Sequence, residues 1–217
     1  MQHNKLKALA VVSQKGGTGK TTLAVNLAVH ASMDGLNVAV IDCDPQRSAA
    51  GWWGIRQHEW PTLIERPAHE LPSILATLEE EGFNLAIIDT RPSVEGETLR
   101  AVQSATAAII SSRPTSFDLR AIALTAQLVR DSGKSGCIVL NQCPPPRSEN
   151  EPSITAEARS VAASLGLPVA PATVSIRVAI PYAASGGMAA CEYEPDGNAT
   201  KEIAALWQHI KGEYLNG

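Results

Sequence analysis

The stretch Ser13-Gln14-Lys15-Gly16-Gly17-Thr18-Gly19-Lys20-Thr21-Thr22 decides the fold of this 217-residue chain. The apolar run Leu9-Ala10-Val11-Val12 precedes it, and a helical pattern from Leu23 to Val29 follows it. A strand, a glycine loop and a helix in this order form a phosphate-binding P-loop. The glycines let the loop curl so that successive N–H groups face phosphate oxygens, and the helix adds the positive end of its dipole. The stretch therefore predicts a nucleotide site built from residues 15–22.

Two residues in this loop have assigned roles, and two depart from the usual pattern. Lys20 is expected to reach the β- and γ-phosphates, and the Thr21 hydroxyl to ligate Mg²⁺. Gln14 stands where the first glycine of the pattern belongs, and Lys15 adds a lysine before the glycine pair. The alternative is a ligand-free glycine turn, which would need neither the second lysine nor the hydroxyls at the helix start.

The composition is that of a globular α/β protein. Hydrophobic residues make up 44% of the chain and charged residues 18%, with few aromatics. The net charge of −4 gives no global basic character, so DNA binding would depend on local patches. No leader-like or membrane-spanning apolar segment is evident, and we expect a cytoplasmic protein.

Strand and helix patterns alternate along the chain, which predicts a doubly wound, mostly parallel sheet flanked by helices. We expect residues 1–217 to form a single domain without a separate N-terminal helix-turn-helix domain. The expected strands are 7–13, 37–42, 84–89, 106–112, 136–141 and 168–173. The expected helices are 20–33, 46–58, 69–81, 95–104, 117–131, 153–165, 177–185 and 197–214.

Acidic residues end two of the expected strands. Val38-Ala39-Val40-Ile41 runs into Asp42 and Asp44, which places both carboxylates at the carboxyl edge of the sheet. Asp44 is suited to orient an attacking water, and Asp42 to hold a water of the Mg²⁺ shell. Asp44-Pro45 is equally suited to cap a helix, and both roles are compatible.

Leu85-Ala86-Ile87-Ile88 ends in Asp89, the pattern of a Walker B strand whose carboxylate anchors Mg²⁺ through water. A later strand ends in Asn141-Gln142-Cys143-Pro144, which lacks the Asn-Lys-x-Asp signature that reads guanine. Adenine is therefore favoured, with Asn141 as the candidate reader of the purine edge.

Three motifs together resemble those of the ParA/MinD ATPases. Lys15–Thr22 resembles their deviant Walker A motif, Asp42–Gln46 their second motif and Ile87–Thr90 their Walker B motif. Pro114–Leu119 and Ile176–Met188 resemble segments of small plasmid-partition proteins of the ParF type. The resemblance covers nearly the whole chain.

The resemblance implies a Mg-ATP-dependent sandwich homodimer with weak ATPase activity. Lys15 would cross the interface to phosphates bound in the partner subunit, because a lysine at the loop rim has no phosphate to reach in its own site. ATP would favour the dimer and slow hydrolysis, stimulated by a ParB-like adaptor, would release it. The catalytic residues would be Lys15, Lys20 and Asp44. The ATP-binding residues would be Lys15, Gly16, Gly17, Thr18, Gly19, Lys20, Thr21, Thr22 and Asn141, with Thr21, Asp42 and Asp89 at the metal.

The implied dimer would bind non-specific DNA, and thus associate with the nucleoid, through basic residues of both chains. Arg177 is the best-matched candidate, followed by Lys201 and Lys211, with a solvated surface charge as the alternative for each. Arg91 follows the Walker B Asp-x pair where family members usually carry proline. A contact with the γ-phosphate and a surface or interface contact are its two interpretations.

Three other classes share the P-loop. A MinD-like membrane ATPase needs a basic amphipathic C-terminal helix, whereas residues 198–215 have a mixed polar face, so no membrane partner is expected. An iron–sulfur reductase of the nitrogenase iron-protein type needs loop cysteines that Cys137 and Cys143 do not match. A small-molecule ligase or kinase would not need Lys15. The alternative function is a MinD-like or other cargo-positioning ATPase that acts on a membrane or a protein assembly.

Overall fold

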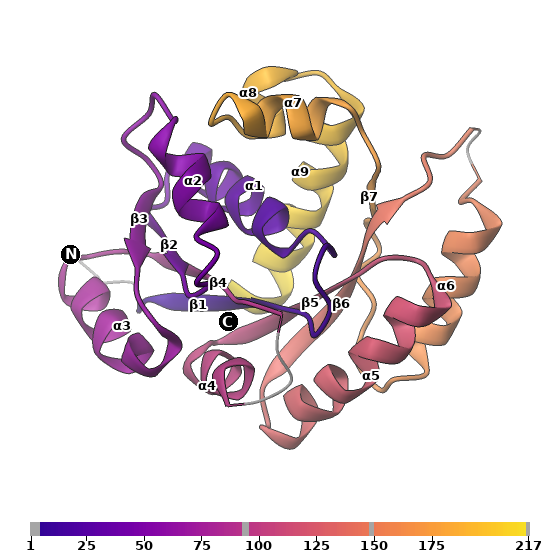
Figure 1. Ribbon diagram of the computed structural model, residues 1–217, viewed down its shortest axis with the longest axis horizontal. Coiled ribbons are helices and arrows are strands. Elements are labelled where there is room, and N and C mark those ends of the chain that lie inside the picture. Colours follow the sequence, from indigo (N-terminus) through magenta and orange to yellow (C-terminus); the bar gives the residue numbers. More distant parts are fainter. Residues whose placement is uncertain (1–4, 93–95, 148–149, 216–217) are drawn as a thin grey trace.

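The computed structural model describes residues 5–92, 96–147 and 150–215, in which helices cover both faces of a seven-stranded sheet (Figure 1). The strand order is β3-β2-β4-β1-β5-β6-β7, and every pairing is parallel. The predicted doubly wound fold is therefore confirmed. The strands are β1 (Lys7–Val12), β2 (Val38–Asp42), β3 (Thr62–Glu65), β4 (Leu85–Asp89), β5 (Ala107–Ser112), β6 (Ser135–Cys143) and β7 (Val174–Ser175).

The helices follow the strands in sequence and return the chain to the start of the next strand. They are α1 (Lys20–Met33), α2 (Ser48–Gly54), α3 (Leu71–Glu80), α4 (Glu97–Ser104), α5 (Ser116–Asp131), α6 (Ser153–Ala163), α7 (Ala179–Ser185), α8 (Ala190–Tyr193) and α9 (Asn198–Ile210). A short η1 turn (Ala68–Glu70) precedes α3, and α9 continues into the π-helical turn η2 (Lys211–Leu215).

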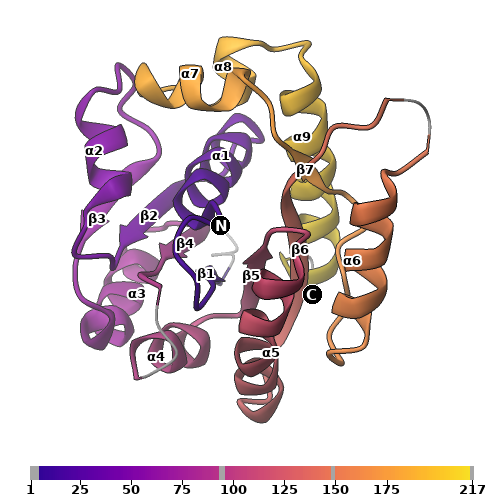
Figure 2. The same cartoon turned by 45° about the vertical axis from the view of Figure 1, so that its right-hand side comes forward.

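The apolar residues of the central strand β1 contribute to the hydrophobic clusters on both faces of the sheet. Leu9 and Val11 belong to the cluster that α1, α8 and α9 complete, while Ala8, Ala10 and Val12 belong to the cluster that α3 to α6 complete. Successive side chains of a strand point to opposite faces, so a strand buried on both sides is apolar throughout. In both views, α1 and α4 lie on opposite sides of the sheet (Figures 1 and 2).

The strand β3 was not expected from the sequence. It contains four residues and follows Pro61, and among the described strands it pairs with β2 alone, from Ala39 opposite Thr62 to Asp42 opposite Glu65. None of its residues is fully buried, so the apolar run that marks the central strands is missing. An edge strand of this kind carries too little hydrophobic signal to be recognised.

The strand expected at 168–173 is wrong. That segment pairs with the sheet at a single bridge between Val169 and Ile138, and the last strand is instead β7. Pro168 and Pro171 have no N–H to donate, so the ladder cannot run through this segment despite its apolar composition.

The helix expected at 46–58 is shorter, and Asp44 does not cap it. The residue before α2 is Arg47, which has a left-handed conformation with φ of 54°. The Asp44 carboxylate instead accepts a hydrogen bond from the N–H of Gln46 at 2.9 Å, which forms a turn ahead of the helix. Other helix ends agree within a few residues, and the first residue of the helix expected at 95–104 lies outside the described residues.

A buried arginine that follows α2 ties this helix to α8 and to the turn between α7 and α8. Arg56 pairs with both carboxylate oxygens of Glu192 at 2.8 and 2.7 Å and donates to the carbonyl of Gly187 at 2.8 Å. Its guanidinium lies over the rings of Trp52 and Trp60, at 4.7 and 5.1 Å from the ring centroids. The helix that follows the Asp42–Asp44 strand end is thereby fixed against the C-terminal part of the chain.

Candidate functional site

The P-loop between β1 and α1 is fastened from behind by side chains at the ends of β5 and β6. Ser111 Oγ donates to the carbonyl oxygen of Thr18 at 2.7 Å, and Asn141 Nδ2 donates to the same oxygen at 2.8 Å. Gln142 Nε2 donates to the carbonyl oxygen of Gly17 at 2.9 Å. The sheet therefore holds the loop in one shape without help from a ligand.

Two glycines in the loop are required for different reasons. Gly17 and Gly19 have φ values of 74° and 82°, which side-chain-bearing residues rarely adopt. A Cβ on Gly19 would also lie 2.4 Å from Asn141 Nδ2, whereas a Cβ on Gly17 would meet no atom within 4 Å. Gly19 immediately precedes α1, whose first N–H groups have no partner within the helix and are available to an anion.

Gln14, which stands where the usual pattern has its first glycine, contacts helix α5. In the orientation that satisfies both of its amide atoms, Gln14 donates to the carbonyl of Ala121 at 2.9 Å and accepts from the N–H of Thr125 at 3.3 Å. Hydrogen bonds therefore link the first residues of the P-loop to α5, and its middle residues to β5 and β6.

A pocket of about 370 Å³ opens in front of the loop. The Lys20 side chain is buried in this region, and burial lowers its pKa, with Asp89 and Asp44 counteracting in part. Gly16 and Gly17 are exposed at the rim, Thr18 is buried, and Thr21 and Thr22 are half-buried at the start of α1. The pocket is lined by Gly17, Gly19, Lys20, Thr21, Thr22, Val25, Asn26, Asp44, Ser48, Trp52, Pro92 and Ala184.

The two strand-ending carboxylates lie on adjacent strands of the sheet. Asp42 and Asp89 are paired in the register of β2 and β4, and both are buried. The Asp42 oxygens accept from the N–H groups of Asp44 and Ala50, each at 3.0 Å. Burial raises the pKa of Asp42 above its usual value, and these backbone hydrogen bonds oppose the rise.

Asp89 has no such support. Among the described residues, neither of its carboxylate oxygens has a hydrogen-bond partner of normal geometry. Burial raises the pKa of Asp89 to about 7, with the neighbouring Thr21 hydroxyl and Lys20 opposing the rise. A buried carboxylate without partners costs free energy unless a ligand or ion completes it.

This arrangement fits a nucleotide-bound Mg²⁺. The Thr21 hydroxyl and the free oxygens of Asp89 are hard oxygen donors of the kind that Mg²⁺ selects, and Asp42 lies beside them. Within the described residues, no group of three His, Cys, Asp or Glu side chains could hold a metal ion alone.

Asn141 lies behind the P-loop rather than at an open base site. Its side chain is buried, Nδ2 donates to Thr18 as described, and Oδ1 accepts from the N–H of Gln142 at 2.8 Å. Both ends of the amide are engaged in this structure. Its role as the reader of adenine stays a prediction.

Lys15 contacts a residue that the sequence did not single out as functional. Its ammonium lies 3.2 Å from Asp118 Oδ1, in the first turn of α5, and its side chain is 38% exposed. Arg113 Nη2 lies 3.1 Å from the same oxygen, and the Thr115 hydroxyl donates to Oδ2. Burial alone would raise the pKa of Asp118, but these donors hold it below its usual range.

The candidate DNA-binding residues lie on or near α9. Arg177 forms an ion pair with Glu202 at 2.7 Å, and Lys211 forms one with Asp34 at 2.9 Å. Lys201 is exposed. Arg177 and Lys211 thus have structural partners in this chain, while Lys201 is open to solvent.

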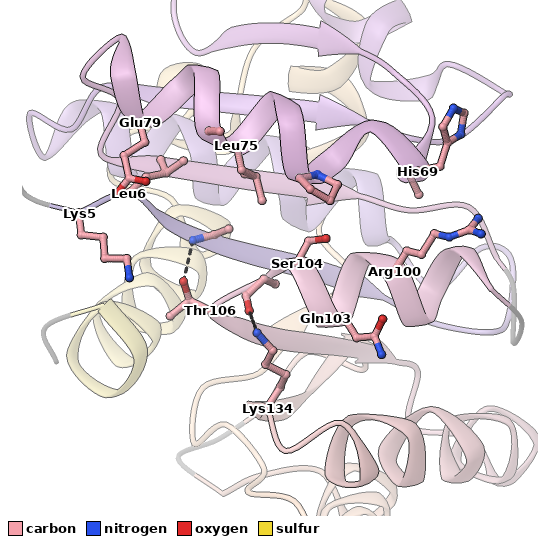
Figure 3. Close-up of a pocket in the computed structure, with 15 residues that line it drawn as sticks. Lys5, Leu6, His69, Leu75, Glu79, Arg100, Gln103, Ser104, Thr106 and Lys134 are labelled. Carbon is pink, nitrogen blue, oxygen red and sulfur yellow. Dashed lines mark hydrogen bonds between the residues drawn. The ribbon is translucent and has the colours of Figure 1, made fainter.

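A second cleft, of about 750 Å³, lies at the opposite edge of the sheet, between α3 and α4 (Figure 3). Lys5, Arg100 and Lys134 are among its lining residues, and Lys134 Nζ donates to the carbonyl of Ala105 at 2.8 Å. None of the predicted site residues lines it. The predicted nucleotide residues instead gather around the carboxyl ends of β1, β2, β4 and β6.

Comparison with known families agrees with this geometry. Residues 9–189 match the model of the CobQ/CobB/MinD/ParA nucleotide binding domain. The chain belongs to this family. Its members include P-loop ATPases of the ParA and MinD type, so the resemblance drawn from the three sequence motifs is confirmed.

Relatives within the family carry different descriptions. The chain is 30% identical over 210 residues to maintenance of carboxysome distribution protein A from Gloeobacter kilaueensis, covering 95% of this chain and 93% of the relative. It is 30% identical over 152 residues to the chromosome-partitioning ATPase Soj from Thermus thermophilus, covering 57% of this chain and 61% of Soj. These two relatives are named for different tasks, carboxysome distribution and chromosome partitioning.

Solved family members share the fold of this chain. The apo form of McdA from Cyanothece superposes with a TM-score of 0.81 at 18% identity, covering 94% of this chain and 99% of McdA. The cell division ATPase MinD from Pyrococcus furiosus superposes with a TM-score of 0.77 at 20% identity, covering 95% and 98%. These similarities establish the common architecture of the family domain.

The C-terminal helix α9 packs on the sheet. Its apolar residues Ile203, Leu206, Trp207 and Ile210 are buried in the core with α1. No helix in the described ranges is both long enough and apolar enough to cross a membrane.

Proposed function

We propose that this chain is an ATP-dependent DNA-partitioning ATPase, a single-domain switch in which Mg-ATP drives a homodimer that binds non-specific DNA. Slow hydrolysis, stimulated by an adaptor protein, releases the dimer. The observation that carries the proposal is the position of Lys15. Its ammonium contacts Asp118 on α5, outside the loop that would hold the phosphates of its own site.

The other site residues have complementary roles in the proposed reaction. Lys20 and the first N–H groups of α1 bind phosphate, and Asp44 orients the attacking water. Thr21, Asp42 and Asp89 would hold a Mg²⁺ ion, whose charge would help to neutralise the phosphates. The half-buried position of Asp44 in the lining of the pocket supports this role.

Two relatives support the DNA-partitioning part of the proposal. Soj is a chromosome-partitioning ATPase, and a ParA protein of Caulobacter vibrioides that is 35% identical over 106 residues is a chromosome partitioning protein. Binding to DNA would place the ATP-bound dimer on the nucleoid. Lys201 is the most accessible of the three candidate contacts.

A second candidate function is the positioning of a protein assembly rather than DNA cargo. It is favoured by the similarity to the carboxysome distribution protein, which extends over 95% of this chain. The two candidates share the ATP-dependent dimer and differ in what the adaptor carries. A MinD-like membrane attachment has less support, because the apolar face of α9 is covered by the core.

ATP turnover and DNA binding, with and without non-specific DNA, test the proposal. The variants are Lys15→Ala and Asp44→Ala, with Lys5→Ala at the opposite cleft as a matched lysine control. We expect weak basal turnover in the wild type, no ATP-dependent dimer for Lys15→Ala, and an ATP-trapped, DNA-bound dimer for Asp44→Ala. Absence of ATP-dependent DNA binding at low salt would defeat the partitioning function and leave the nucleotide site intact.

A further inference from the structure

The Lys15 ammonium is held within its own chain by a preassembled acidic site. Asp118 is 1% exposed, so its carboxylate cannot be solvated and depends on donors from the protein. Lys15 and Arg113 share Oδ1, while the Thr115 hydroxyl occupies Oδ2. Asp118 also lies in the first turn of α5, where a negative charge is favoured by the helix dipole.

We propose that Asp118 is a positioning residue for Lys15, which it retains in the unassembled chain and releases when the ATP-bound dimer forms. The inference rests on the proposed function, because it assumes that Lys15 reaches the partner subunit's phosphates. In the isolated chain, Lys15 contacts Asp118, so dimer formation must break this ion pair. Asp118 therefore opposes assembly until phosphates offer Lys15 a stronger partner.

Arg113 makes this release feasible. Removal of one partner from a buried ion pair is strongly unfavourable when the other charge is left alone. Asp118 would not be left alone, because Arg113 already contacts Oδ1 at 3.1 Å. The Nε–H of Arg113 is also buried and has no hydrogen-bond partner among the described residues. This donor can complete a two-point contact with Asp118 once Lys15 leaves.

The two neighbours of Lys15 are therefore expected to act in opposite directions. Asp118→Asn keeps an acceptor for Thr115 but removes the charge that retains Lys15, so it favours the dimer. Arg113→Gln removes the cation that replaces Lys15, so it disfavours the dimer. A merely structural role of this cluster would weaken the dimer in both variants, because both would loosen the start of α5.

The test measures the dimer dissociation constant with saturating Mg-ATP by sedimentation, in an Asp44→Ala background that prevents turnover. We expect the constant to fall about two- to tenfold for Asp118→Asn and to rise by a similar factor for Arg113→Gln, as for a partly exposed ion pair. The matched controls are Asp131→Asn and Arg120→Gln, which make the same charge changes at exposed positions of α5. Both control variants should have the same dimer dissociation constant as the Asp44→Ala protein without a further substitution.

The outcomes separate this inference from the proposed function. If Lys15→Ala in the same background still dimerises with ATP, the proposed function fails and the inference fails with it. If Lys15→Ala abolishes the dimer, while Asp118→Asn and Arg113→Gln shift the constant in the same direction or leave it unchanged, only the inference is wrong. Each variant is first checked for wild-type ATP binding, and Arg113→Gln decides the matter if Asp118→Asn does not fold.

Discussion

Asp42 and Asp89 occupy paired positions in the parallel register of β2 and β4, yet only one of these buried carboxylates is satisfied by the protein. Asp42 accepts two backbone N–H groups, whereas the Asp89 oxygens have no partner of normal geometry in the described part of the chain. Asp42 therefore also shapes the turn that carries Asp44, in addition to its proposed role at Mg²⁺, whereas the Asp89 oxygens are left for a ligand to complete.

Asp89→Asn is expected to stabilise the ligand-free protein while it impairs magnesium-dependent nucleotide binding. At pH 8 the substitution replaces a buried, unpartnered carboxylate by a neutral amide, which should raise the free energy of unfolding by on the order of 2 kcal/mol. Urea unfolding and ATP titrations with and without Mg²⁺ measure the two effects. Asp42→Asn is the control and should destabilise the protein, because it loses an acceptor of a backbone N–H. A destabilised Asp89→Asn protein would contradict this account.

Gly19→Ala is expected to impair nucleotide binding more severely than Gly17→Ala. Both substitutions force a left-handed backbone on alanine, at a cost of about 1–2 kcal/mol. Only the Cβ at position 19 also collides with Asn141, so Gly19→Ala displaces the amide that holds Thr18. Titration with a fluorescent ATP analogue compares the variants. An equal loss of nucleotide affinity in the two variants would show that the hydrogen bond from Asn141 to Thr18 is unimportant for binding.

Arg91→Ala is expected to leave basal ATP turnover within about twofold of the wild type, far from the ~10³-fold loss of an arginine finger. The Arg91 guanidinium lies 2.5 Å from the Glu97 carboxylate, and its side chain is 45% exposed, which supports the surface-contact interpretation. Steady-state phosphate release measures the effect, with Glu97→Ala as the control for the lost pair. If Arg91→Ala greatly reduced ATP turnover and Glu97→Ala did not, the result would favour a contact between Arg91 and the γ-phosphate.

Asp34→Asn is expected to destabilise the protein at neutral pH and not at strongly acidic pH. Asp34 accepts from Lys211 at 2.9 Å and from Trp207 Nε1 at 2.7 Å, and these hydrogen bonds lower its pKa. A carboxyl group with a lowered pKa contributes stability above its unfolded pKa, and this stability is lost as the pH falls through the folded pKa. The wild-type advantage, about 1 kcal/mol at pH 7, should therefore shrink below about pH 4. Urea unfolding at several pH values checks this, with Asp131→Asn as the control.

Arg56→Ala is expected to lower the free energy of unfolding by about 3 kcal/mol, because it leaves the half-buried Glu192 carboxylate without its main partner. The stacking on Trp52 and Trp60 is lost as well. The double variant Arg56→Ala/Glu192→Gln should be less destabilised than the sum of the single variants. Additive effects in urea unfolding would show that the ion pair is energetically unimportant.

The central strands and the nucleotide loop could be predicted from the sequence because their signals are local. Each central strand is a continuous apolar run, and the P-loop is a contiguous motif with a required context. The edge strand β3 and the segment 168–173 could not be assigned correctly. The first has no apolar run, and in the second Pro168 and Pro171 remove ladder donors from an apolar stretch.

The contacts around Lys15 and Asn141 were beyond the reach of sequence reasoning. Lys15 and Asp118 are far apart in the chain, and only the packing of α5 beside the P-loop brings them together. Asn141 was recognised as a polar strand end, but its orientation toward Thr18 depends on the sheet register. The Arg113 and Ser111 roles likewise follow from neighbouring strand ends, for which no local motif exists.

The fastening of the P-loop by Ser111, Asn141 and Gln142 has a thermodynamic consequence. The loop is ordered when the chain folds, so an arriving nucleotide does not have to supply that ordering entropy. More of its binding free energy is then available to change contacts at the exposed rim, where Lys15 lies. In the proposed switch, this preordered loop would let the presence of the γ-phosphate change the contacts that Lys15 makes with a partner subunit.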